Sequence, residues 1–157
     1  MSRKDQTCIV VGGGLAGLVA ATVLQRAGVQ VTVLDKGRGI GGRLATRRIQ
    51  DDALGEGVFD YGAQYFTVRD ERFRTQVANW QERGIVERWQ AAGEDAWVGT
   101  PGMNAPIRAM AEELGVQFGA RIGRIERDGQ RWLIAGEGFD PAAFDRLVLR
   151  FREELGD

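Results

Sequence analysis

The sequence contains no histidine and only one cysteine, Cys8, among its 157 residues. Without an imidazole, catalysis by Ser-His-Asp or Cys-His arrangements and zinc binding through histidine are excluded. A single cysteine forms neither an internal disulfide nor a four-cysteine metal centre, so we expect no metal site and a reducing, cytoplasmic location. Any chemistry must therefore depend on carboxylates, hydroxyls, arginine or a bound cofactor.

Neither sign of charge is in excess, because 21 basic residues face 22 acidic ones and the net charge is −1. A chain so balanced has no overall field that would attract nucleic acid or an anionic membrane surface. Residues 6–25 carry no charge, but glycines occupy positions 12–14, where a membrane span would need its apolar centre. We therefore predict no nucleic-acid partner and no membrane segment.

Glycine is the residue type in excess, with 23 copies, and twelve of them lie between Gly12 and Gly62. Backbone that rich in glycine turns sharply or lies close to another group. A chain of this length is typical of one domain. The region from Gly12 to Gly62 is therefore where we look first for a binding site.

The first 34 residues predict a strand–helix–strand unit. Thr7–Val11 is a short β-branched run typical of a buried strand, and Gln30–Leu34 is a second one. Between them, Leu15–Ala27 is small and apolar, typical of a buried helix, and Gly28 stands where a helix C-cap belongs. A βαβ unit with a right-handed crossover is the α/β arrangement that this order predicts.

The remaining elements are predicted from periodicity, capping residues and turn residues. In chain order we expect a hairpin within 44–59, a helix capped by Asp70 and running to about Arg83, strands at 85–90 and 97–98, a helix capped by Asn104 and ending at Gly115, a β-hairpin over 121–134, and a strand at 144–149.

The turn after the first strand has the pattern G-x-G-x-x-G at Gly12, Gly14 and Gly17, and Asp35 follows the second strand. This context is typical of a dinucleotide fingerprint, in which the glycines allow a tight turn, approach of a pyrophosphate and close packing of helix on strand. Asp35 can accept hydrogen bonds from ribose hydroxyls and would repel a 2′-phosphate, which disfavours NADP. The alternative is a glycine-rich turn that binds nothing.

A second glycine pair, Gly41-Gly42, is followed by Arg43. A nicotinamide-binding Rossmann domain would usually continue into another helix and strand here. A glycine pair followed by a planar, always charged guanidinium is suited to approach a pyrophosphate from another side. Since Arg47 and Arg48 follow, an ordinary surface arginine remains the alternative.

Several segments together resemble the FAD-dependent amine oxidase-like flavoproteins, and among them the bacterial members of the renalase-type branch. The similarity extends from about Cys8 to Leu149. It implies a Rossmann-like FAD-binding domain that combines the βαβ unit with an antiparallel β-hairpin crossover and part of a substrate-binding domain. The segments that carry it are Gly12–Gly17, Asp35-Lys36, Gly41–Arg43, Phe59–Thr67 and Trp97–Met103.

The resemblance implies noncovalent FAD, in agreement with the absence of histidine and the place of Cys8 inside a strand. It implies that Ala16 and Arg43 meet the pyrophosphate, that Gln64, Tyr65 and Pro101-Gly102 lie near the flavin, and that the Ile122 backbone lies against the adenine. The complete expected set is Gly12, Gly14, Ala16, Gly17, Asp35, Lys36, Gly42, Arg43, Gln64, Tyr65, Pro101, Gly102 and Ile122.

From the residues alone, some of these side chains have a simpler interpretation. Tyr61, Tyr65 and Phe66 would be core aromatics, and Trp97 and Met103 would be core residues as well. No spacing of carboxylates or hydroxyls suggests an acid–base pair, so we assign no catalytic residue.

The activity implied by the resemblance is hydride transfer from a small reduced substrate, a dihydronicotinamide isomer or an amine, to flavin and then to oxygen. Family members are about twice as long as this chain. We therefore expect residues 1–149 to form the FAD domain with a partial substrate-domain excursion at about 60–103, a polar tail at 150–157, and no C-terminal half of the family fold. A surface left uncovered in this way favours self-association.

Two other functions remain open. The chain could be a truncated, non-catalytic remnant that binds a dinucleotide through its adenosine and pyrophosphate contacts. It could also be an NAD-dependent dehydrogenase or an NAD sensor, against which the Gly41–Arg43 segment argues.

Overall fold

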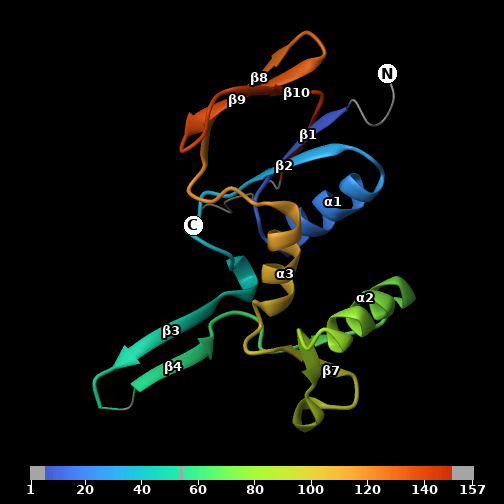
Figure 1. Ribbon diagram of the computed structural model, residues 1–157, viewed down its shortest axis with the longest axis vertical. Coiled ribbons are helices and arrows are strands. Elements are labelled where there is room, and N and C mark those ends of the chain that lie inside the picture. Colours follow the sequence, from blue (N-terminus) through green and yellow to red (C-terminus); the bar gives the residue numbers. More distant parts are fainter. Residues whose placement is uncertain (1–5, 54, 150–157) are drawn as a thin grey trace, which may run out of the picture. The chain divides into compact units, whose positions relative to one another are not determined.

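The computed structural model describes residues 6–53 and 55–149, so the predicted polar tail at 150–157 lies outside the described residues (Figure 1). The chain divides into two compact units, one formed by Met1–Gly39 with Ala111–Asp157 and the other by Ile40–Met110. The second unit is wider at both ends than the excursion expected at 60–103. Each unit is described by itself below.

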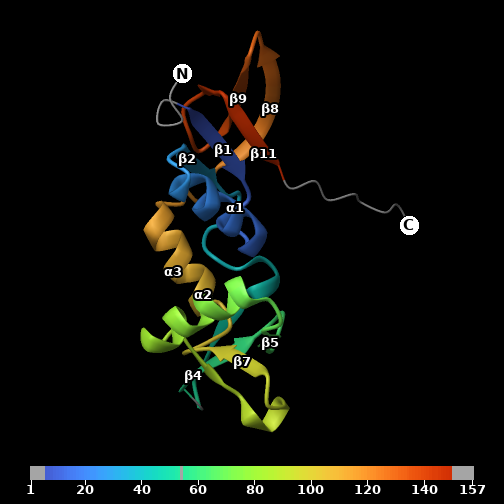
Figure 2. The same ribbon diagram turned by 90° about the vertical axis from the view of Figure 1, so that its right-hand side faces the viewer.

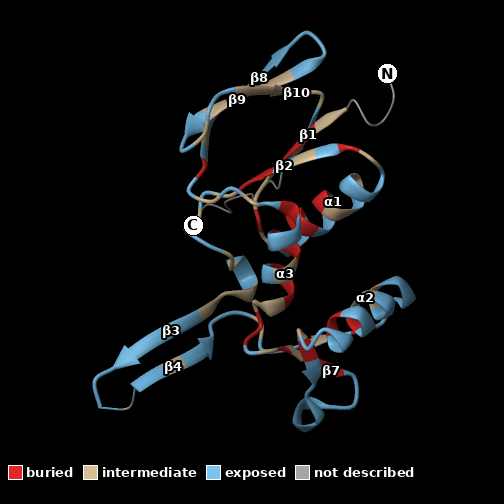
Figure 3. Ribbon diagram, viewed as in Figure 1, coloured by how far each residue is buried: buried red, intermediate tan, exposed pale blue. Residues whose placement is uncertain are grey.

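The first unit contains the predicted βαβ element. β1 (Thr7–Val11) pairs in parallel with β2 (Gln30–Leu34), and α1 (Leu15–Arg26) connects them. On its other side β1 pairs in parallel with β11 (Arg146–Leu149), which gives the strand order β11-β1-β2. The centre of β1, Cys8 to Val10, is fully buried, as expected for the middle strand of a parallel sheet (Figure 3).

An antiparallel sheet packs against this parallel sheet (Figure 2). It consists of β8 (Arg121–Asp128), β9 (Arg131–Glu137) and β10 (Ala142–Phe144) in the order β10-β9-β8. The contact is made by a buried cluster of Ile9, Leu34, Ala120 and Ile134. This is the crossover hairpin predicted from the sequence, extended by a third strand.

The strand predicted at 144–149 is confirmed as β11, but it begins at Arg146 and not at Phe144, because the chain changes sheets at Asp145. Phe144 pairs antiparallel with Trp132, whereas the next residues pair in parallel with β1. The Asp145 carboxylate accepts hydrogen bonds from the Thr7 amide at 2.8 Å and the Thr7 hydroxyl at 3.0 Å. These bonds fix the transition between sheets through residues 138 positions apart.

We expect Asp145 to make stability depend on pH. Hydrogen bonds from the Thr7 amide and hydroxyl hold the pKa of Asp145 below its ordinary value of 3.8 in the folded chain. The stabilisation is complete above that ordinary value and is lost as pH falls through the lowered pKa. Urea unfolding should show that the free energy of unfolding falls from neutral to acidic pH. We expect Asp145→Asn to reduce this fall, and Asp140→Asn, at an exposed carboxylate, to leave it unchanged. Parallel declines in all three proteins would contradict this role.

The second unit contains a β-hairpin and a small three-stranded sheet. β3 (Thr46–Asp51) and β4 (Gly55–Asp60) form the hairpin, which is exposed along most of its length (Figure 3). β5 (Phe66–Thr67), β7 (Ala96–Gly99) and β6 (Val86–Arg88) form a sheet in the order β5-β7-β6. One 3₁₀ turn, η2 (Gly42–Leu44), precedes β3, and another, η3 (Gln90–Ala92), lies between β6 and β7. The boundary between the units falls within α3 (Ala105–Leu114).

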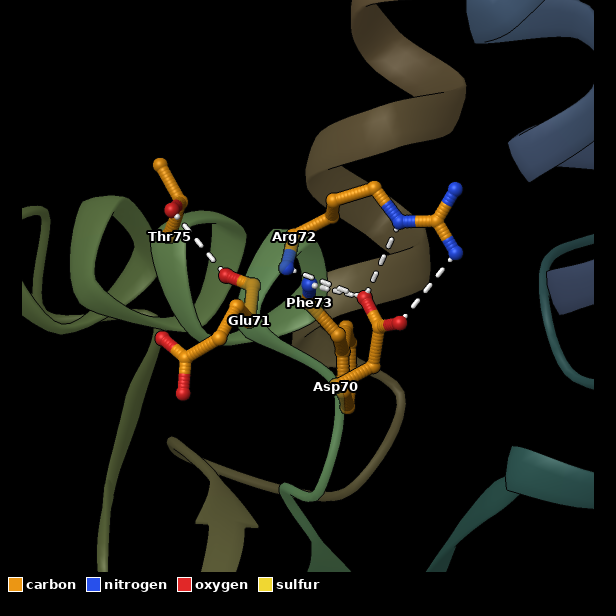
Figure 4. A network of polar contacts seen from close by, with 5 residues as sticks. All are labelled: Asp70, Glu71, Arg72, Phe73 and Thr75. Carbon is orange, nitrogen blue, oxygen red and sulfur yellow. Dashed lines mark hydrogen bonds and ion pairs between the residues drawn. The ribbon is translucent and has the colours of Figure 1, made fainter.

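The predicted helix after Asp70 is confirmed as α2 (Glu71–Glu82). The Asp70 carboxylate accepts hydrogen bonds from the amides of Arg72 and Phe73 and also pairs with the Arg72 guanidinium (Figure 4). A capping aspartate satisfies amides that the helix itself leaves unpaired. Val77 and Trp80 on its inner face are buried.

None of the helices in residues 6–53 and 55–149 has the length and apolar character that a membrane span requires.

Candidate dinucleotide site

The glycine-rich turn between β1 and α1 has the geometry that its sequence predicts. Gly12 has φ of 109°, a left-handed conformation that favours glycine. A Cβ atom on Gly17 would lie 1.9 Å from the carbonyl oxygen of Gly12. The helix can therefore pack on the turn only because position 17 has no side chain, which is the role that the fingerprint gives to its third glycine.

The start of α1 is suited to bind an anion. Gly14, at the N-cap, provides no side-chain cap, and the first turn contains no acidic residue. Ala16 in that turn is exposed. Unpaired amides and the partial positive charge at a helix start attract phosphate groups in general, so this exposed helix start has the chemistry that an anion site needs.

Asp35 lies directly after β2, and both of its carboxylate oxygens already accept hydrogen bonds from the backbone. Oδ2 accepts from the Gly13 amide at 2.6 Å, and Oδ1 accepts from the Gly37 amide at 2.7 Å. The carboxylate is not simply solvated, since the residue is half-buried and its side chain connects two loops. A carboxylate has about four acceptor positions, so ribose hydroxyls can still bind to it.

The backbone of Asp35 forms hydrogen bonds with the segment that leads into β8 and Ile122. The Asp35 amide donates to the Gln117 carbonyl, and the Ala120 amide donates to the Asp35 carbonyl, both at 2.9 Å. Ile122 follows on β8, where it is half-buried and packs against the buried cluster of the first unit. The first unit thus brings the fingerprint, Asp35 and the chain leading to Ile122 together, with Lys36 exposed beside Asp35.

In the second unit, the segments of Arg43 and of Gly62 lie side by side. The Ala63 amide donates to the Arg43 carbonyl at 3.0 Å, and the Tyr61 amide donates to the Ala45 carbonyl at 2.9 Å. A Cβ atom on Gly62 would lie 2.0 Å from the Arg43 carbonyl oxygen, so this contact also requires glycine. Gly42 has φ of 60°, and the exposed Arg43 side chain forms no ion pair with any residue that the structure describes.

The segment around Gly102 lies against the same region. A Cβ atom on Gly102 would come within 3.0 Å of the Thr46 side chain and within 3.4 Å of Asp60 Oδ1. Gly102 is buried, whereas Pro101 before it is exposed. The Gly102 backbone therefore packs against the side chains of Thr46 and Asp60, neither of which was among the residues expected from the sequence.

The residues of the second unit that were predicted to lie in the core divide into two groups. Trp97 and Met103 are buried, as predicted for core residues. The same prediction is wrong for Tyr61 and Tyr65, which are 78% and 46% exposed, because neither packs into the small sheet. The Tyr65 ring contacts Trp89 edge-on at 6.0 Å. With Gln64 also exposed, this segment presents polar and aromatic side chains that a ligand could cover.

Other reactive groups contribute little to this region. Cys8 is fully buried, and burial raises the pKa of its thiol, which makes it a poor nucleophile. Among the described residues, no three acidic or cysteine side chains are grouped closely enough to bind a metal ion.

Known proteins are similar to parts of this chain. Residues 10–79 match the NAD(P)-binding Rossmann-like domain family. The L-amino-acid oxidase of Mus musculus is 53% identical over 47 residues, which is 30% of this chain and 8% of that protein. The carotenoid phi-ring synthase of Streptomyces griseus is 38% identical over 121 residues, which is 71% of this chain and 23% of that protein.

Solved structures share the fold. The CLA-producing fatty acid isomerase of P. acnes superposes with a TM-score of 0.74 at 14% identity, covering 93% of this chain and 59% of that one. A putrescine oxidase variant superposes with a TM-score of 0.68 at 15% identity, covering 92% and 57%. At such identities the likeness shows the fold alone.

The fold is therefore Rossmann-like, and residues 10–79 contain an NAD(P)-binding type of nucleotide fold. The chain spans only 8% and 23% of the two curated relatives described above.

Proposed function

We propose that this chain is the FAD-binding part of an amine oxidase-type oxidoreductase of the renalase branch. The observation that carries the proposal is the preformed turn in which Gly12 and Gly17 are in contact and Asp35 holds the Gly13 amide. That geometry exposes a helix start beside a carboxylate, which suits a pyrophosphate joined to a ribose. The names of the relatives, an amino-acid oxidase and a putrescine oxidase, favour a flavin over a nicotinamide.

Each expected residue would hold a particular part of the cofactor. In the first unit, Gly14 and Ala16 would bind the pyrophosphate, Asp35 the ribose and the Ile122 backbone the adenine, with Lys36 nearby. In the second unit, Arg43 would pair with the pyrophosphate after the turn at Gly42. Binding would be noncovalent, because Cys8 is buried and the sequence contains no histidine.

The flavin-facing residues would orient the ring and its substrate. Gln64 and Tyr65 would border the ring, and Pro101 with Gly102 would lie near it. FAD, when bound, would supply the redox chemistry, by accepting a hydride from an amine or a dihydronicotinamide and passing electrons to oxygen. The chain's own contribution is binding, orientation and exclusion of water, and none of its described residues is assigned a proton-transfer role.

The proposal is tested by loading the purified chain with FAD and recording its visible spectrum. We expect a yellow protein whose flavin absorbance bleaches when a dihydronicotinamide or an amine is added without oxygen and returns on exposure to air. A protein that stays colourless after refolding with FAD would exclude flavin binding. A yellow protein that neither type of substrate bleaches would instead establish a binding function without turnover.

A further inference from the structure

Asp60, the last residue of β4, holds three separate segments of the second unit together through one carboxylate oxygen. Its Oδ1 atom accepts hydrogen bonds from the Thr46 hydroxyl at 2.7 Å and from the Met103 amide at 2.9 Å. The Thr46 hydroxyl oxygen also accepts from the Asn104 amide at 3.3 Å. The ladder between β3 and β4 ends at the Thr46–Asp60 pair, so these side-chain bonds connect the hairpin to residues 103–104.

Each of these segments also carries residues of the proposed cofactor site. Thr46 follows Arg43, Asp60 precedes Gln64 and Tyr65, and Met103 follows Pro101 and Gly102. The contact leaves little room, because a Cβ atom on Gly102 would lie 3.0 Å from Thr46. A change at Asp60 would therefore shift two of the segments relative to the third.

We propose that Asp60 is a positioning residue, which sets the places of the segments that would lie against the flavin. A charged acceptor makes stronger hydrogen bonds than a neutral one, so a carboxylate is well suited to fix two donors at once. The inference rests on the proposed FAD-binding function, and it adds that the flavin half of the cofactor depends on a residue that need not touch it.

The test compares the affinities of FAD and ADP, because ADP lacks the flavin. In Asp60→Ala we expect FAD to bind about tenfold more weakly, while ADP, which meets only Arg43 among the residues of these segments, loses much less affinity. Asp60→Asn should recover much of the FAD affinity, because an amide oxygen can still accept. The circular dichroism of the bound flavin should change in Asp60→Ala, and Asp95→Ala, at an exposed carboxylate of the same unit, should leave it unchanged.

Hydrogen exchange gives a readout that needs no cofactor. The Met103 amide should exchange faster in Asp60→Ala than in the parent, with the amides of α1 unaffected. Parental FAD affinity and flavin dichroism in Asp60→Ala would overturn the positioning role, as would an equal loss of ADP and FAD binding together with a lower Tm. A parent chain that binds ADP but no FAD would overturn the proposed function itself, which is a different result.

Discussion

Asp35→Ala should bind ADP and FAD alike with about ten- to hundred-fold weaker affinity than the parent chain. The carboxylate would accept hydrogen bonds from both ribose hydroxyls, and bonds to a charged group contribute about 1.5–3 kcal/mol each when they are shielded from water. Since the residue is half-buried, we expect the lower part of that range, at roughly tenfold in affinity for each 1.4 kcal/mol. Isothermal titration with each ligand measures the loss.

The same variant should also be less stable without ligand. Removing the carboxylate leaves the amides of Gly13 and Gly37 without the acceptors that they have in the structure. Asp35→Asn should be nearly as unstable, because its amide offers one acceptor oxygen where two donors converge. Asp140→Ala, at an exposed carboxylate of the same unit, is the matched control. ADP affinity in Asp35→Ala equal to that of the parent would show that the ribose role is wrong.

Gly17→Ala should cause a large loss of stability in the first unit. The added Cβ atom would lie 1.9 Å from the Gly12 carbonyl oxygen, and the next contact is also backbone. Because a backbone atom cannot rotate away, the helix must move from the turn, at an expected cost of at least about 3 kcal/mol in the free energy of unfolding. Urea unfolding measures this cost.

Gly39→Ala is the matched control for that experiment. A Cβ atom on Gly39 meets nothing within 4 Å, and its φ lies outside the left-handed range. We expect a change of about 0.5 kcal/mol or less, in either direction. Equal stability of Gly17→Ala and Gly39→Ala would contradict the close packing of helix and turn on which the dinucleotide site depends.

The βαβ element was predictable because its signals are local. The apolar runs of β1 and β2, the glycines between them and Gly28 after α1 fix each boundary to within a residue or two. The burial of α1 was less predictable. Leu15, Val19 and Val23 are 40%, 46% and 61% exposed, so an apolar helix does not by itself show which of its faces is covered.

The parts that could not be predicted depend on contacts distant in sequence. The change of sheets at Asp145 is decided by Thr7, which no periodicity within 144–149 can indicate. The bonds of Asp35 to two loop amides depend on the backbone path of those loops. Asp60 could have been selected, because a carboxylate at a strand end next to a glycine motif is a recognisable signal, but its partner Met103 lies 43 residues away.

A titration with FAD, NAD and NADP under one set of conditions tests most directly whether the nucleotide fold of this chain binds FAD. We expect FAD to bind most tightly, NAD more weakly, and NADP most weakly of the three, because Asp35 would repel its 2′-phosphate. Binding of NAD much tighter than that of FAD would contradict the account and would favour an NAD-dependent dehydrogenase or an NAD sensor.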